Sequence, residues 1–115
     1  MAISHDRVVL FKPQGSMDLQ GGMTFSQQML EVTPQPQQLW VIDLSAVDFM
    51  DSSGLVPLIN GLTSARESGC RLVLCNVQAP VRLILELTQL DSVFEIFDTY
   101  EDIFTNTNDR NLAIA

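Results

Sequence analysis

The chain has 115 residues, of which 46% are apolar and 17% are charged, and its formal net charge is -8. This length fits one domain with its own core, and the composition is that of a globular protein rather than a disordered one. An acidic surface repels phosphate backbones and anionic lipid headgroups, which argues against nucleic acid and membrane surfaces as direct partners. A protein with a basic patch is the better candidate, although acidity alone also serves solubility.

The two cysteines, Cys70 and Cys75, are five residues apart, around one apolar run. Residues at this spacing on a strand point to opposite faces, so we expect reduced, structural thiols rather than a disulfide or a shared metal site. Reduced thiols are consistent with a cytoplasmic protein. The N-terminus has no basic region leading into an apolar run, so no signal peptide is expected. No apolar stretch is long enough to span a bilayer.

In chain order, the first predicted element is a short buried strand over 8–11. Residues 17–22 form a turn into a helix, along which apolar residues then recur at helical spacing as far as Val32. The polar stretch 33–38 contains two prolines and is predicted to be a loop. The clearest strand covers 39–44, a nearly continuous apolar run typical of a central strand covered on both faces.

The second half of the chain continues the same alternation. The predicted elements are a helix from near Ser53 to Gly69, a strand over 72–75, a helix from Ala79 and Pro80 through Thr88, a strand over 93–97 and a short helix over 100–104. Residues from 106 onward are expected to fray, and 112–115 could dock on the domain. Alternating strands and helices indicate an α/β domain with a sheet of about four strands, largely parallel or mixed, and helices packed on it.

Few residue combinations in this chain could carry catalysis. His5 is the only histidine, so no Ser-His-Asp arrangement is expected. There is also no cysteine or histidine cluster for zinc and no glycine-rich phosphate loop. We therefore predict neither a metal, a cofactor nor an enzymatic activity.

Polar residues gather instead at one connection between a strand and a helix. Asp43, Asp48 and Asp51 flank it, and Ser52 and Ser53 immediately precede the helix. Functional loops of open α/β sheets lie at the carboxyl ends of strands. The simpler interpretation is capping, because Asp or Ser before a helix satisfies its free backbone N–H groups.

The start of this helix is also suited to an anion. Free N–H groups and the helix dipole favour negative charge there, so these amides would hold a phosphate on Ser52 without unfolding the helix. Such a phosphate adds roughly -1.5 to -2 of charge. Pro57 supports a helix start near Ser53, because its missing N–H is harmless only within the first turn.

The segment at 49–55, FMDSSGL, resembles the signature of the anti-sigma-factor antagonists, the STAS family. Residues 15–18 resemble the earlier Gly-x-x-Asp of the family, 69–74 its later step from glycine to strand, and 91–97 its closing strand. The resemblance covers nearly the whole chain, so it implies a single STAS domain over 1–115 with the STAS fold.

The resemblance implies a binding module that is switched by phosphorylation. A partner kinase of the GHKL ATPase type, often itself an anti-sigma factor, modifies the first serine after the aspartate, which is Ser52 here. The unmodified antagonist binds the kinase and frees its client, the phosphorylated form cannot bind, and a PP2C-type phosphatase restores it. Asp18, Asp51, Ser53 and Gly54 map onto the partner-binding surroundings of the phosphosite.

The sequence departs from the family pattern in three places. Val56 and Pro57 stand where many members have a glycine, Gln89 replaces a common glycine, and the N-terminus is short enough to lack an extra strand of some members. The family also includes transporter tails and scaffold or sensor domains, so a non-switching scaffold or sensor subunit is the alternative. The serine at position 52 favours the switch. The sequence names neither the kinase, its client nor the oligomeric state.

Overall fold

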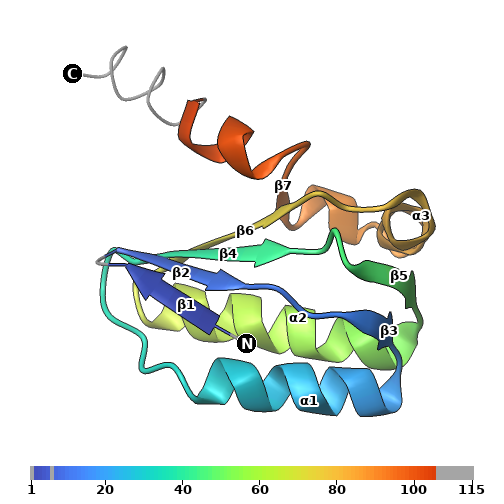
Figure 1. Ribbon diagram of the computed structural model, residues 1–115, viewed down its shortest axis with the longest axis horizontal. Helices are drawn as coiled ribbons and strands as arrows, with labels where there is room; N and C mark the ends of the chain where they lie inside the picture. The colour runs from blue at the N-terminus through green and yellow to red at the C-terminus, as the bar shows by residue number, and fades with distance from the viewer. Residues whose placement is uncertain (1, 6, 106–115) are drawn as a thin grey trace.

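A computed structural model describes residues 2–5 and 7–105 of the chain (Figure 1). The strands are β1 (Ala2–His5), β2 (Val8–Phe11), β3 (Gly15–Met17), β4 (Leu39–Asp43), β5 (Val47–Met50), β6 (Arg71–Cys75) and β7 (Glu95–Phe97). The helices are α1 (Leu19–Leu30), α2 (Ser52–Glu67), α3 (Ala79–Leu87), the 3-10 turn η1 (Leu90–Ser92) and a last helical segment over 100–105. The predictions for 106–115 fall outside the described residues.

The main sheet has five strands in the order β1-β2-β4-β6-β7. β2, β4, β6 and β7 run parallel to one another, whereas β1 pairs antiparallel with β2. The prediction of an α/β fold with a largely parallel sheet is confirmed. The expectation that the N-terminus lacks an extra strand is wrong, because Ala2 to His5 form the edge strand β1. Four residues are too few to show a periodicity, so only pairing with β2 makes this strand visible.

A second, small sheet joins two segments that the sequence predicted as connections. β3 and β5 pair in parallel, and the Gly15 N–H donates to the carbonyl of Ala46 at 2.9 Å. The predicted last strand over 93–97 is also shorter, because η1 precedes it and β7 covers only Glu95–Phe97. Such three-residue strands depend on a partner strand far away in sequence, which no local pattern reveals.

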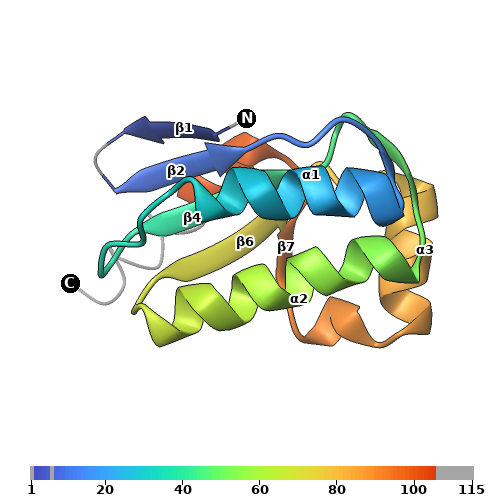
Figure 2. The same cartoon turned by 90° about the horizontal axis from the view of Figure 1, so that it is seen from below.

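Helices α1 and α2 lie side by side over one face of the main sheet (Figures 1 and 2). The larger core lies beneath them, where Phe11 packs against Phe25 and Trp40 with ring centroids 6.1 and 5.3 Å apart. The apolar stripe of α2 is mostly buried there, including Leu58 and Ala65. Burying such a stripe against a sheet is what stabilises an amphipathic helix in water.

The opposite face of the sheet carries a smaller core under the helical segment at 100–105. Val41, Val73 and Cys75 of the sheet pack there with Ile103. Cys70 belongs to the larger core, so the two cysteines point to opposite faces, as predicted. Both are buried free thiols. Strand β4 is covered on both faces, as its continuous apolar run predicts.

Candidate functional site

The candidate site lies where the two strands of the small sheet end. Met17 and Met50 are paired across β3 and β5, so Asp18 and Asp51 follow at matching positions. The Asp51 N–H donates to the Met17 carbonyl at 3.3 Å and ties the two strand ends together. The structure therefore brings the Asp18 and Ser52 loops to one edge. The supporting sheet differs from the prediction, because β5 separates this edge from the main-sheet strand β4.

Each aspartate is the N-cap of the helix that follows it. An Asp18 carboxylate oxygen accepts the Gly21 N–H at 2.9 Å, and an Asp51 carboxylate oxygen accepts the Ser53 N–H at 2.9 Å. Both side chains are half-buried. The capping interpretation is thus correct for α2, where a carboxylate rather than a serine hydroxyl performs it, and Asp18 caps α1 in the same way. Two helix N-termini with acidic caps stand next to each other at this edge.

Ser52 is the first residue of α2, and its side chain is exposed. Ser53 is half-buried, and its N–H is already taken by Asp51. The Gly54 N–H also donates within this turn, to the Asp51 carbonyl at 3.0 Å. The amides expected to hold a phosphate on Ser52 therefore have partners, so a phosphate would compete with the Asp51 carboxylate for the helix N-terminus.

Gly54 is buried and packs against Met17, the last residue of β3. A Cβ on Gly54 would stand 2.2 Å from the Met17 carbonyl oxygen and 2.5 Å from its Cγ. Gly22 on α1 is similarly close to α2, since its Cβ would meet the Ser53 carbonyl oxygen at 3.0 Å. Gly54 therefore acts here by bringing α2 against β3. Its contribution to a partner surface stays a prediction.

Pro57 does not lie in the first turn, contrary to the sequence prediction. Helix α2 begins at Ser52, which places Pro57 inside the helix, in its second turn. Proline has no N–H, so the Ser53 carbonyl loses the usual acceptor role toward residue 57. Pro57 is buried, and its Cγ would lie 3.2 Å from a Cβ on Gly22. Packing against α1 explains why the proline is tolerated there.

The remaining acidic residues of the connection have different surroundings. Asp43 ends β4 with 9% exposure, and its carboxylate accepts the Ser45 N–H at 2.9 Å and the Asn76 side-chain amide at 3.2 Å. It holds the loop between β4 and β5, so it is not a surface residue of the site. Asp48 is exposed on β5 and adds negative charge near Asp51.

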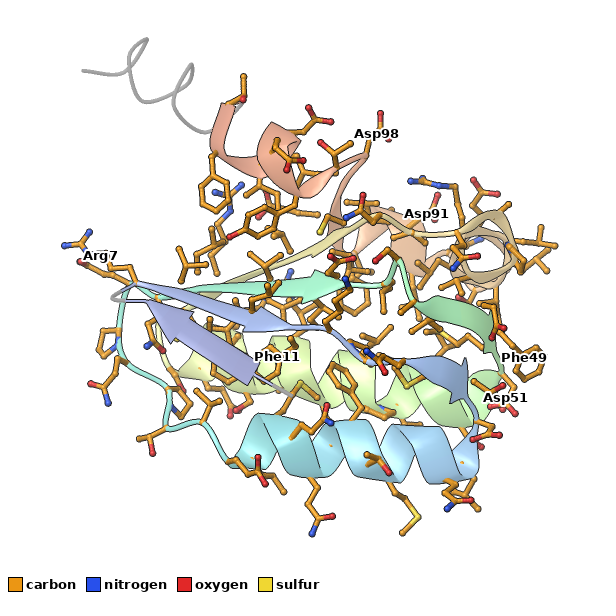
Figure 3. All side chains as sticks on the ribbon, viewed as in Figure 1. Arg7, Phe11, Phe49, Asp51, Asp91 and Asp98 are labelled. Atoms are coloured by element: carbon orange, nitrogen blue, oxygen red, sulfur yellow. The ribbon has the colours of Figure 1, made fainter. Side chains whose placement is uncertain are left out.

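Two exposed apolar residues border the site and were not predicted. Phe49 is 49% exposed on β5, and Figure 3 shows it at the same end of the molecule as Asp51. Leu19 opens α1 directly after Asp18 and is 68% exposed. The FMDSSGL signature contains Phe49, but only the edge position of β5 leaves this ring in solvent. The site thus combines a serine hydroxyl, carboxylates and apolar side chains.

Within residues 2–5 and 7–105, no group of three or more His, Cys, Asp or Glu side chains is arranged to hold a metal ion. The helices in this part of the chain are too short or too polar to cross a membrane. Burial, together with the charges of Asp43 and Glu101, raises the pKa of the Cys75 thiol to about 12. Cys75 is consequently a protonated core residue near neutral pH.

Comparison with known proteins supports the same family. An anti-sigma F factor antagonist of Paenibacillus polymyxa is 26% identical over 102 residues, which is 88% of this chain and 87% of that protein. A crystal structure of an anti-sigma factor antagonist from Mycobacterium paratuberculosis is 28% identical, with a TM-score of 0.71 over 92% of this chain and 90% of the other. A candidate anti-sigma factor antagonist of Thermotoga maritima shares the fold, with a TM-score of 0.79, 23% identity and 92% of each chain covered. The STAS domain family matches residues 1–103, and this chain therefore belongs to that family.

Proposed function

We propose that this protein is an anti-sigma-factor antagonist whose binding to a GHKL-type serine kinase is switched by phosphorylation of Ser52. The observation that carries the proposal is the exposed Ser52 hydroxyl at the first position of α2, between two capped helix starts. The likeness to the antagonist of P. polymyxa supports the antagonist role. A PP2C-type phosphatase would remove the phosphate. These partners, and the reduced thiols, correspond to a cytoplasmic location.

The unmodified protein would bind its partner through the edge formed by Asp18, Asp51, Ser53 and Gly54. The chain has a net charge of -8, and the carboxylates of Asp18 and Asp51 stand at neighbouring helix starts. A partner surface with Arg or Lys would be attracted to this edge, and salt would weaken the attraction.

Phosphorylation would act locally. A phosphate on Ser52 adds roughly -1.5 to -2 of charge beside Asp51, within a short distance in sequence of the exposed Asp48. Because Ser52 is exposed, the phosphate remains in water and the fold is retained. A partner surface shaped for a neutral hydroxyl would instead bury an unpaired charge, which costs about 2–5 kcal/mol of binding free energy.

The alternative function is a non-switching STAS scaffold or sensor subunit of a larger assembly. Such a protein would use the same edge for assembly and would not need an accessible hydroxyl. The exposure of Ser52 therefore favours the switch over the scaffold. Catalysis by this chain itself is the weakest option, since the described residues include no group of side chains that could hold a metal ion, and the Asp51 carboxylate beside the serines caps the helix.

The intact mass of the protein separates these functions. Incubation with its cognate kinase and ATP should add one phosphate, and Ser52→Ala should remain unmodified. Phosphopeptide mapping then places the modification. A scaffold subunit would keep its mass under the same conditions while still binding its partner, and a phosphate on Ser53 would show that the site assignment is wrong.

A further inference from the structure

A groove lies between α1 and α2, the two helices that run side by side over one face of the main sheet (Figure 2). Near the start of the helices it encloses about 510 Å³ between Leu19, Met23 and Val56, and it includes Ser53. A second hollow of about 380 Å³ continues it, and the two share Ser26 and Leu30. We call this surface the α1–α2 groove.

No residue that lines the α1–α2 groove is charged, although the chain has 14 acidic and 6 basic residues. Four of its large apolar side chains are exposed: Leu19 by 68%, Met23 by 64%, Leu30 by 84% and Val56 by 53%. Single exposed apolar residues are ordinary on a protein surface. A contiguous, uncharged apolar strip over two helices is instead typical of an interaction surface.

Two glycines, Gly22 and Gly61, lie where α1 and α2 pack against each other at the base of the groove. A Cβ on Gly22 would meet the Ser53 carbonyl oxygen at 3.0 Å, and a Cβ on Gly61 would meet the Met29 sulfur at 2.8 Å. At Gly22 the two helices are therefore packed close to backbone contact, and at Gly61 the Met29 side chain fills the space between them. The exposed apolar walls of the groove remain in water unless another molecule covers them.

Acidic residues stand at both ends of the groove. Asp18 and Asp51 precede its two helices at one end, and the exposed Glu31 caps α1 at the other. A second copy of this chain laid along the groove would bring carboxylates against carboxylates in either direction. A partner with an apolar middle and positively charged ends is complementary to it.

We propose that the α1–α2 groove binds an amphipathic helix of the kinase partner, with one apolar face and Arg or Lys at its ends. This inference rests on the proposed function, because the groove reaches Ser53 and the same partner must reach Ser52. A helix suits this floor, since it satisfies its own backbone hydrogen bonds, whereas an extended segment would leave them unpaired against apolar side chains. The 12 residues of α1 offer roughly 18 Å of length for it.

A synthetic peptide titrated into the full chain tests the proposal. The peptide is a helix of about 14 residues, roughly 21 Å long, with leucines on one face and arginines at both ends. A matched peptide has glutamates at both ends. In NMR spectra of the protein, the backbone amide resonances of Met23, Leu30 and Val56 should shift on titration with the arginine peptide. Binding should weaken at least about tenfold for the glutamate peptide and for the Met23→Glu and Leu30→Glu variants.

Leu87→Glu is the matched control, because Leu87 is 75% exposed on α3, outside the groove. It should leave the affinity unchanged. The proposal is overturned if both peptides bind equally, if neither binds, or if the signals that shift lie on α3. It is also overturned if the free protein is a dimer that Met23→Glu dissociates, since the occupant would then be a second copy.

Failure of this inference is distinguishable from failure of the proposed function. The phosphate on Ser52 is measured by mass, independently of the peptide. If the protein is phosphorylated on Ser52 but does not bind the peptide, the proposed switch is supported and the proposed docking groove is wrong. If the protein binds the peptide but is never phosphorylated, the proposed switch is wrong and the docking groove is supported.

Discussion

Gly54 touches the backbone of Met17 so closely that a Cβ on Gly54 would stand 2.2 Å from the Met17 carbonyl oxygen. This contact joins the start of α2 to the end of β3 and thereby places Asp51 beside Asp18. The glycine of the signature is thus required by the geometry of the site, before any partner is considered.

Gly54→Ala should lower the stability of the protein by about 2 kcal/mol, because a methyl group has no room against a backbone carbonyl. Gly61→Ala is the matched control in the same helix. The nearest atoms to its Cβ would be the sulfur and methyl of Met29 and a Leu72 methyl, all of them side-chain atoms, and alanine is the better helix former, so its effect should be small. Urea denaturation of both variants measures the difference. Equal losses would show that the Met17 contact does not govern the position of α2.

Asp51→Ala should destabilise the protein by about 1 kcal/mol, since the Ser53 N–H loses its capping carboxylate. Asp51→Asn retains a capping oxygen and should keep most of the stability. Comparing how these two variants bind the partner also distinguishes the contribution of the capping hydrogen bond from that of the negative charge. If Asp51→Asn and Asp51→Ala have the same lowered melting temperature, the side chain stabilises the fold through its charge rather than through the capping hydrogen bond.

Ser52→Asp should weaken kinase binding by at least about tenfold, because it puts a charge where the partner meets a hydroxyl. Its melting temperature should barely change, since Ser52 is exposed and an acidic residue suits the first turn of a helix. Ser52→Ala should bind normally and never be phosphorylated. Calorimetric titration and mass spectrometry give the two readouts. Ser53→Ala serves as the neighbouring control and should still accept a phosphate on Ser52.

Asp18→Arg should weaken and slow association with the kinase, because it reverses a charge beside Ser52 at the shared strand edge. Asp98→Arg makes the same charge change on the exposed surface that Figure 3 shows far from Asp51, so it should have little effect. Association rates measured between low and high salt should fall for the wild type. Equal effects of the two variants would show that only the net charge matters.

Cys75 should make the protein less stable at alkaline pH. Burial raises the pKa of its thiol from 9.0 to about 12, so the unfolded chain loses this proton first. The stabilising contribution is complete below about pH 9 and is lost as the pH rises toward 12. Melting temperatures across this range should fall more steeply for the wild type than for Cys75→Ala. Parallel slopes would show that other groups cause the alkaline loss.

The amino-acid sequence by itself determined the fold class and the position of the candidate serine. The continuous apolar run of β4 and the stripe of α2 are strong patterns, because burial on two faces or along one stripe constrains many residues at once. The FMDSSGL signature indicated the family through adjacent residues, which need no tertiary contact to be read.

The tertiary structure decided how the site is assembled. β3 and β5 are strands of three or four residues that pair with each other across about 30 residues of sequence, so no local pattern could predict them. β1 pairs with the neighbouring β2, but its four residues are too few to show a strand pattern by themselves. The same holds for Pro57, whose place inside α2 is acceptable because it packs against Gly22 of another helix. The exposure of Leu19, Met23 and Val56 is likewise a property of the packed helix pair. Hydrophobicity in a sequence shows that a side chain favours burial, and only the packed fold shows which side chains remain exposed.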